Sequence, residues 1–94
     1  MTNKDFKPNW IIELVKEQEP DRLDVIDALL KCTNGIWESR AYIYFVSQKN
    51  VNQKGAEWQF KENIVLEHKK VGTIVLDVLK DGRIGGIEFV KYIR

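Results

Sequence analysis

The chain has 94 residues, which is enough for one domain, and 44% of them are hydrophobic and 31% charged. This balance excludes a disordered chain, and a net charge of +1 argues against a dedicated nucleic-acid binder, which usually carries a basic excess. The single cysteine, Cys32, excludes an intrachain disulfide and a cysteine-based metal cluster.

The sequence favours a cytoplasmic protein without a membrane partner. Its longest continuous apolar stretch runs from Ala41 to Val46, which is far too short to span a bilayer. The first residues contain no apolar run of signal-peptide length.

Two helices are predicted within residues 1–34. Apolar residues recur at helical spacing in two sets, one before Pro20 and one after it. The first set is Trp10, Ile11, Leu14 and Val15, and the second is Leu23, Ile26, Leu29 and Leu30. Asn34 and Gly35 end the second helix, since both residues tolerate the left-handed backbone of a helix C-terminus.

Four strands are predicted within residues 35–94, because the apolar period changes from about 3.6 to 2. Their ranges are Ile36–Val46, Glu57–Glu67, Val71–Leu79 and Arg83–Ile93, with a polar loop at Ser47–Ala56. Asp81-Gly82 predicts a type I′ hairpin turn, and Gly85-Gly86 predicts a β-bulge. The expected fold is therefore α+β, a single domain in which two N-terminal helices pack on one face of a four-stranded antiparallel meander.

Alternation separates the two faces of this sheet. The side chains expected beneath the helices are Trp37, Ala41, Ile43, Phe45, Trp58, Phe60, Ile64, Leu66, Ile74, Leu76, Val78, Ile87 and Phe89. The opposite face carries tyrosines and charges of both signs. It is either a solvated face steadied by cross-strand pairs or a partner-binding surface, because Tyr and Arg are enriched where proteins dock.

Residues that could carry chemistry are few. His68 is the only histidine and Cys32 has no partner signature, so we expect a surface residue and a buried thiol. Asp77 and Glu88 are expected close together, and an ion pair with Arg40 or Lys61 is favoured over a metal site, an acid–base pair or a partner contact. The sequence contains no HExxH, CxxC or GK[ST] motif, and it predicts neither an enzyme nor a cofactor nor a metal.

The charge is unevenly distributed along the chain, since residues 36–94 carry a charge of +3 while residues 1–35 carry −2. The sheet half also holds aromatic residues, as RNA-binding sheets do. Its outward acidic residues, among them Glu38, Glu57 and Asp77, would oppose phosphate. The pattern therefore argues against nucleic-acid binding.

The segment Ile74–Phe89, with an Asp before the turn and Gly86-Ile87-Glu88 after it, resembles a C-terminal hairpin of several small bacterial proteins. In size, cytoplasmic character, absence of catalytic motifs and expected two-helix, four-strand layout, the whole chain resembles the small immunity proteins that neutralise secreted bacterial toxins, including those of contact-dependent inhibition systems. Many of these are acidic, and the near-neutral charge here departs from that pattern.

This resemblance implies a non-enzymatic module that binds and blocks a cognate protein toxin. The residues expected to contact the partner are Arg40, Tyr42, Tyr44, Lys61, Asp77 and Glu88. Addition of a partner strand to a free sheet edge is another route. The alternatives are a small RNA-binding protein or a homodimeric accessory protein.

Overall fold

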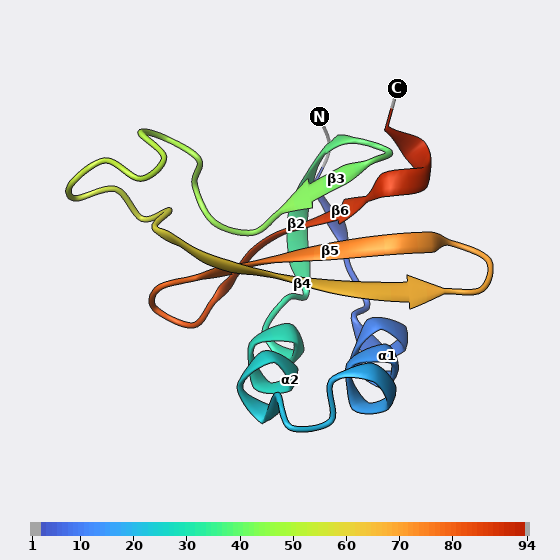
Figure 1. Ribbon diagram of the computed structural model, residues 1–94. Coiled ribbons are helices and arrows are strands. Elements are labelled where there is room, and N and C mark those ends of the chain that lie inside the picture. Colours follow the sequence, from blue (N-terminus) through green and yellow to red (C-terminus); the bar gives the residue numbers. More distant parts are fainter. Residues whose placement is uncertain (1–2, 94) are drawn as a thin grey trace.

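The computed structural model describes residues 3–93 and shows two helices on one face of an antiparallel sheet (Figure 1). The helices are α1 (Asn9–Gln18) and α2 (Leu23–Leu30). The strands are β1 (Asn3–Asp5), β2 (Asn34–Ser39), β3 (Tyr42–Tyr44), β4 (Phe60–His68), β5 (Gly72–Leu79) and β6 (Ile84–Phe89). The six strands lie in the order β1-β2-β3-β6-β5-β4, and a 3₁₀ turn, η1 (Val90–Tyr92), follows β6. The α+β class is confirmed, with more strands than expected.

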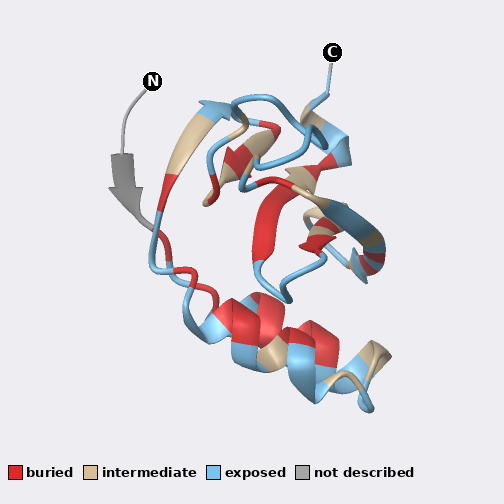
Figure 2. Ribbon diagram, turned by 90° about the vertical axis from the view of Figure 1, so that its left-hand side faces the viewer, coloured by how far each residue is buried: buried red, intermediate tan, exposed pale blue. Residues whose placement is uncertain are grey.

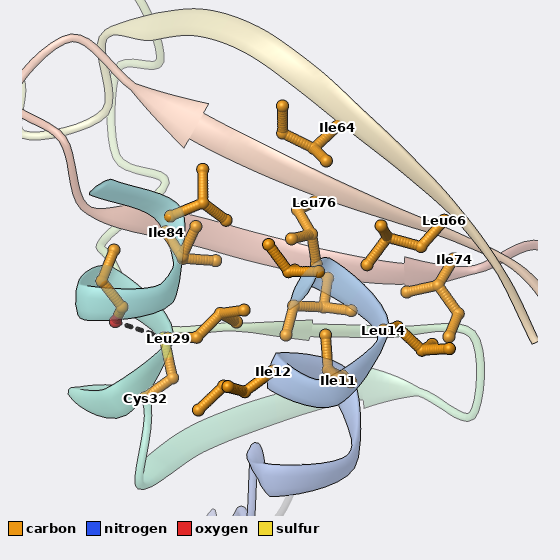
Figure 3. Close-up of a cluster of buried hydrophobic side chains, with 14 of the residues drawn as sticks. Ile11, Ile12, Leu14, Leu29, Cys32, Ile64, Leu66, Ile74, Leu76 and Ile84 are labelled. Carbon is orange, nitrogen blue, oxygen red and sulfur yellow. Dashed lines mark hydrogen bonds between the residues drawn. The ribbon is translucent and has the colours of Figure 1, made fainter. Parts of the chain in front are cut away.

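The core lies between the helices and the sheet, and the buried sides of both helices point towards the strands (Figure 2). Close packing of branched aliphatic side chains from α1, β4 and β5 is visible in Figure 3. Most of the side chains predicted for this face are buried in this core as expected, namely Ile43, Ile64, Leu66, Ile74, Leu76, Val78, Ile87 and Phe89. Ala41 is also buried, but it lies in the β2–β3 turn and lines a hollow outside this core. Each fully buried aliphatic side chain contributes roughly 1.5–3 kcal/mol, so this layer is the main source of stability.

The single strand predicted at Ile36–Val46 is wrong, because the chain reverses at Arg40 and Ala41 to form the β2–β3 hairpin. The hydroxyl of Ser39 accepts a hydrogen bond from the Ala41 N–H at 3.0 Å. This local bond makes a turn without glycine or proline, so the sequence carries no obvious breaker.

The meander is also wrong, because β3 pairs with β6 and not with β4. The chain between Phe45 and Gln59 leaves the sheet as a long loop and re-enters at the opposite edge as β4 (Figure 1). This loop crosses the width of two strands, because the β5–β6 hairpin lies between β3 and β4 in the sheet. Of the predicted strands, the last three correspond to β4, β5 and β6, which do form a sequential meander.

The β5–β6 hairpin keeps one predicted feature and changes another. Asp77 pairs with Gly86 and Val78 with Ile84, so Gly85 is the extra residue of a bulge, as expected. The turn is not type I′, since only Gly82 has a positive φ, of 91°. The N–H of Gly82 donates to the Leu79 carbonyl at 2.9 Å, which is typical of a three-residue loop closed by a left-handed glycine.

Candidate functional site

The six side chains predicted to contact a partner come from several elements of the outer face, which we define as the sheet face opposite the helices. Arg40 and Lys61 are exposed, and the other four are half-buried. Arg40 lies in the β2–β3 turn, Tyr42 and Tyr44 in β3, Lys61 in β4, Asp77 in β5 and Glu88 in β6. These six side chains do not form one cluster. Some belong to a hydrogen-bonded network, some line surface depressions, and Lys61 lies on an edge strand of the sheet.

A network centred on Asp77 crosses the outer face. The Tyr42 hydroxyl donates to one carboxylate oxygen of Asp77 at 2.9 Å, and the Asn63 amide donates to the other at 2.7 Å. The Gln48 amide donates in turn to the Tyr42 oxygen at 3.3 Å. Because Gly86 lies opposite Asp77 and has no side chain, the Tyr42 ring can extend across β6 to reach the carboxylate. The network therefore ties β3, β5 and β4 together over a glycine gap.

Burial and pairing shift the proton affinities in this network. Burial raises the pKa of Asp77, although its hydrogen bonds from Tyr42 and Asn63 act in the opposite direction. Burial, followed by the charge of Asp77, raises the pKa of Tyr42, which therefore remains a hydrogen-bond donor. Both effects suit a structural role for this pair.

The expected ion pair of Asp77 or Glu88 with Arg40 or Lys61 is wrong. Asp77 lies opposite Gly86, and Glu88 lies opposite Val75. The ion pairs found among residues 3–93 include neither carboxylate. The two cations have other neighbours, since Lys61 lies 4.0 Å from Glu62 and Arg40 lies over an aromatic ring.

Part of the outer face is covered by the loop that joins β3 to β4. Val46, Trp58 and Leu79 form a second buried cluster, and Tyr42 and Tyr44 pack against it. The prediction that placed Trp58 beneath the helices is therefore wrong. Gly85, the bulge residue, leaves room for the Trp58 ring, because a Cβ at this position would come within 2.8 Å of that ring.

Phe60 is also misplaced in the sequence interpretation, since it is 38% exposed. The β4–β5 register shifts between Phe60 and Glu62, and this irregularity breaks the period-two alternation. Trp37 and Phe45, likewise predicted to be inward, are half-buried and pack at the border of the main core.

Three of the predicted contact residues line one depression, which we call the polar hollow. It has a volume of about 730 Å³ and lies between the β2–β3 turn and the C-terminal end of the described chain. Its lining consists of Glu38, Ser39, Arg40, Ala41, Tyr42, Gln48, Glu88, Tyr92 and Ile93. Charges of both signs and two tyrosines thus surround a single depression.

A second depression, which we call the aromatic cleft, adjoins the first. It has a volume of about 450 Å³ and is lined by Phe6, Lys7, Trp10, Trp37, Arg40, Val71, Phe89 and Tyr92. Arg40 and Tyr92 line both depressions, and the Arg40 guanidinium lies 5.2 Å from the centre of the Tyr92 ring. Sequence reasoning missed this cleft because it assigned Trp10 and Trp37 to the core. The signal available in the sequence was the presence of aromatic residues at Phe6, Trp10 and Trp37, near the start of the helical region and near the start of the sheet.

Tyr44 and Lys61 lie apart from these depressions. Tyr44 stacks on Tyr42 with ring centres 6.4 Å apart, and it lines a different hollow beside Lys49. Lys61 is on the edge strand β4. The structure therefore does not gather all six predicted contacts into one site.

Cys32 and His68 have structural surroundings. The Cys32 thiol is buried and donates to the Ala28 carbonyl at 3.5 Å (Figure 3), and burial raises its pKa to about 12. The His68 Nδ1 accepts hydrogen bonds from the N–H groups of Lys70 and Val71, at 3.1 and 3.0 Å, and so shapes the β4–β5 turn.

Among residues 3–93, no group of three or more His, Cys, Asp and Glu side chains is arranged to hold a metal ion. No helix in this part of the chain has the length and apolar character needed to cross a bilayer.

Comparison with protein-family models, with curated proteins and with solved structures found no match.

Proposed function

We propose that this protein is a non-enzymatic protein-binding module that docks its partner around Arg40 and Tyr92. The observation that carries the proposal is that these two side chains line two adjoining depressions, one polar and one aromatic. Arg, Tyr and Trp are the residues most enriched at binding hot spots. An interface of standard size covers about 800 Å² per partner, which is roughly an eighth of the 6148 Å² surface.

We further propose that the partner is a bacterial toxin domain and that the protein acts as its immunity protein in the cytoplasm. Support comes from the resemblance in size and in the absence of catalytic motifs to small immunity proteins. By covering or distorting the active site of the toxin, a preformed patch around Arg40 would neutralise it without chemistry of its own. The contacts proposed first are Arg40, Tyr42 and Glu88, and Tyr92 joins them because it shares their hollow.

The test is growth rescue. Each reading frame that flanks the gene is expressed in a bacterial host with and without this chain. One of them is expected to arrest growth, the chain is expected to restore it, and the two proteins should co-purify. If no flanking product is toxic, or if a toxic one is neither bound nor neutralised, the immunity proposal fails.

Two variants sharpen the result. Arg40→Glu reverses the charge shared by both depressions, whereas Lys54→Glu makes the same change on the exposed loop between β3 and β4. Rescue should be lost in the first and kept in the second, with both variants folded by circular dichroism. An RNA-binding role would instead give an affinity for RNA that falls steeply with salt, and a homodimer would give a mass that rises with concentration.

A further inference from the structure

The aromatic cleft has a continuous floor of stacked rings. The Trp10 and Phe89 rings lie 6.2 Å apart at an interplanar angle of 25°, and the Phe89 and Trp37 rings lie 5.7 Å apart at 24°. Phe6 borders these rings at a tilt of 58°, with its ring 6.4 Å from that of Trp37. Trp10 remains 37% exposed, so a large aromatic surface faces solvent in the cleft. An aromatic group of a partner can pack against this exposed ring surface in an offset or edge-to-face arrangement.

The rim of the cleft is positively charged. Among the described residues, the lining contains two cations, Lys7 and Arg40, and no acidic side chain. A third cation is held close by, because the Lys91 ammonium lies 5.9 Å from the Tyr92 ring and donates to the Lys70 carbonyl at 3.1 Å. An occupant that carries negative charge beside its apolar group would therefore be attracted to this rim.

We propose that the aromatic cleft is the docking site for an acidic segment of a partner protein. In this arrangement one aromatic side chain of the partner packs against the exposed Trp10 ring, and flanking carboxylates pair with Arg40 and Lys7. The inference rests on the proposed role as a protein-binding module and adds the chemistry of the partner.

A peptide fits this surface better than a nucleic acid strand does. A strand would have to continue along a cationic track, since phosphates repeat along its backbone. Beyond Arg40, however, the polar hollow presents Glu38 and Glu88, which would repel phosphates. A peptide needs only one ring and its neighbouring carboxylates within the cleft.

The test uses the sequence Gly-Ser-Glu-Asp-Phe-Asp-Glu-Ser-Gly, blocked at both ends, as a probe for the full chain. Heteronuclear NMR follows the three indole N–H signals. Trp10 and Trp37 lie in the cleft, while Trp58 is buried in the separate cluster and serves as an internal reference. The expected result is a saturable shift of the first two signals and a static third, with a dissociation constant on the order of 0.1–1 mM.

Matched peptides and variants define the specificity. In the peptide, replacing the four acidic residues by lysine, or the phenylalanine by alanine, should weaken binding at least about tenfold. In the protein, the double variant Lys7→Glu/Arg40→Glu should weaken binding by a similar factor. Lys7→Glu alone should weaken binding about threefold and guards against a folding defect at Arg40, while Lys54→Glu should bind like the wild type.

Several results would overturn the inference. One is the absence of a saturable shift at 5 mM peptide, and another is equal binding of the lysine peptide. A third uses octauridylate, a short single-stranded RNA, as a probe: if it binds more tightly than the acidic peptide, the cleft is an RNA site. Because the probe needs no cognate partner, its failure leaves the growth-rescue result standing. Conversely, if the protein binds the acidic peptide but does not rescue growth, the cleft is a docking site that is independent of the immunity role.

Discussion

Gly86→Ala should destabilise the fold through a single side chain, Tyr42. A Cβ on Gly86 would lie 2.5 Å from the Tyr42 Cζ atom and closer still to its hydroxyl, so the ring has to move and its bond to Asp77 breaks. Overpacking costs about 1–3 kcal/mol and loss of a hydrogen bond to a charged group about 1.5–3 kcal/mol. Alanine offsets about 0.4–1 kcal/mol by restricting the unfolded chain, so the net loss should be about 1.5–5.5 kcal/mol.

A double-mutant cycle makes this prediction specific. With Tyr42→Ala already in place, the clash is absent, and Gly86→Ala should be neutral or stabilising by up to about 1 kcal/mol. The coupling energy should thus be about 2.5–6 kcal/mol, measured by urea unfolding of the four proteins followed by circular dichroism. If Gly86→Ala changes the stability by less than about 0.5 kcal/mol, or if the two substitutions are additive, then Tyr42 does not lie across Gly86 as described.

Three further predictions concern Asp77, Cys32 and Gln18. Burial raises the pKa of Asp77 above its ordinary 3.8, so this residue contributes stability that is present below about pH 4 and is lost as the pH rises through the raised value. In urea titrations the stability of the wild type relative to Asp77→Asn should therefore fall as the pH rises above about 4, and a flat or rising difference would contradict this expectation. With its pKa raised from 9.0 to about 12, Cys32 should react with a thiol reagent at pH 8 roughly a thousandfold more slowly than a free thiol, and comparable rates would show that it is accessible. The Gln18 amide donates to the Glu67 carbonyl at 2.7 Å, and the Gln18 amide oxygen accepts from the Glu67 N–H at 2.9 Å. Gln18→Ala should therefore speed hydrogen exchange of the Glu67 N–H at least about tenfold. Unchanged exchange would mean that other contacts protect this edge of β4.

Much of the inner layer could be predicted from the sequence, because a strong period identifies the buried side of a helix or strand. The inward positions Ile64, Leu66, Ile74, Leu76 and Val78 follow from alternation alone, and they are buried. The bulge at Gly85 followed from two adjacent glycines inside a strand pattern. These features depend on local pattern, which a single sequence records well.

Features that depend on distant partners could not be predicted in this way. Nothing near Ser39 distinguishes a turn from a continuous strand, since its hydroxyl makes the turn by bonding the Ala41 N–H. Trp58 is as apolar as a core residue, but its burial site exists only because Gly85 leaves room on the outer face.

The candidate site shows the same limit. Tyr42 and Asp77 were correctly placed on the outer face, yet their bond to each other depends on the missing side chain of Gly86 and on a strand order that the sequence does not reveal. The aromatic cleft needs residues from α1, β2 and β6 to meet, and Trp10 and Trp37 look like core residues when only their spacing is known.

The most direct test of docking at the Arg40–Tyr92 pair is calorimetric titration of the toxin domain identified by growth rescue into the wild type, Arg40→Glu and Lys54→Glu. Loss of a hot-spot residue costs about 2 kcal/mol or more, so Arg40→Glu should weaken binding at least about 30-fold while Lys54→Glu leaves the dissociation constant unchanged. A folded Arg40→Glu protein that binds within about twofold of the wild type would show that the partner docks elsewhere.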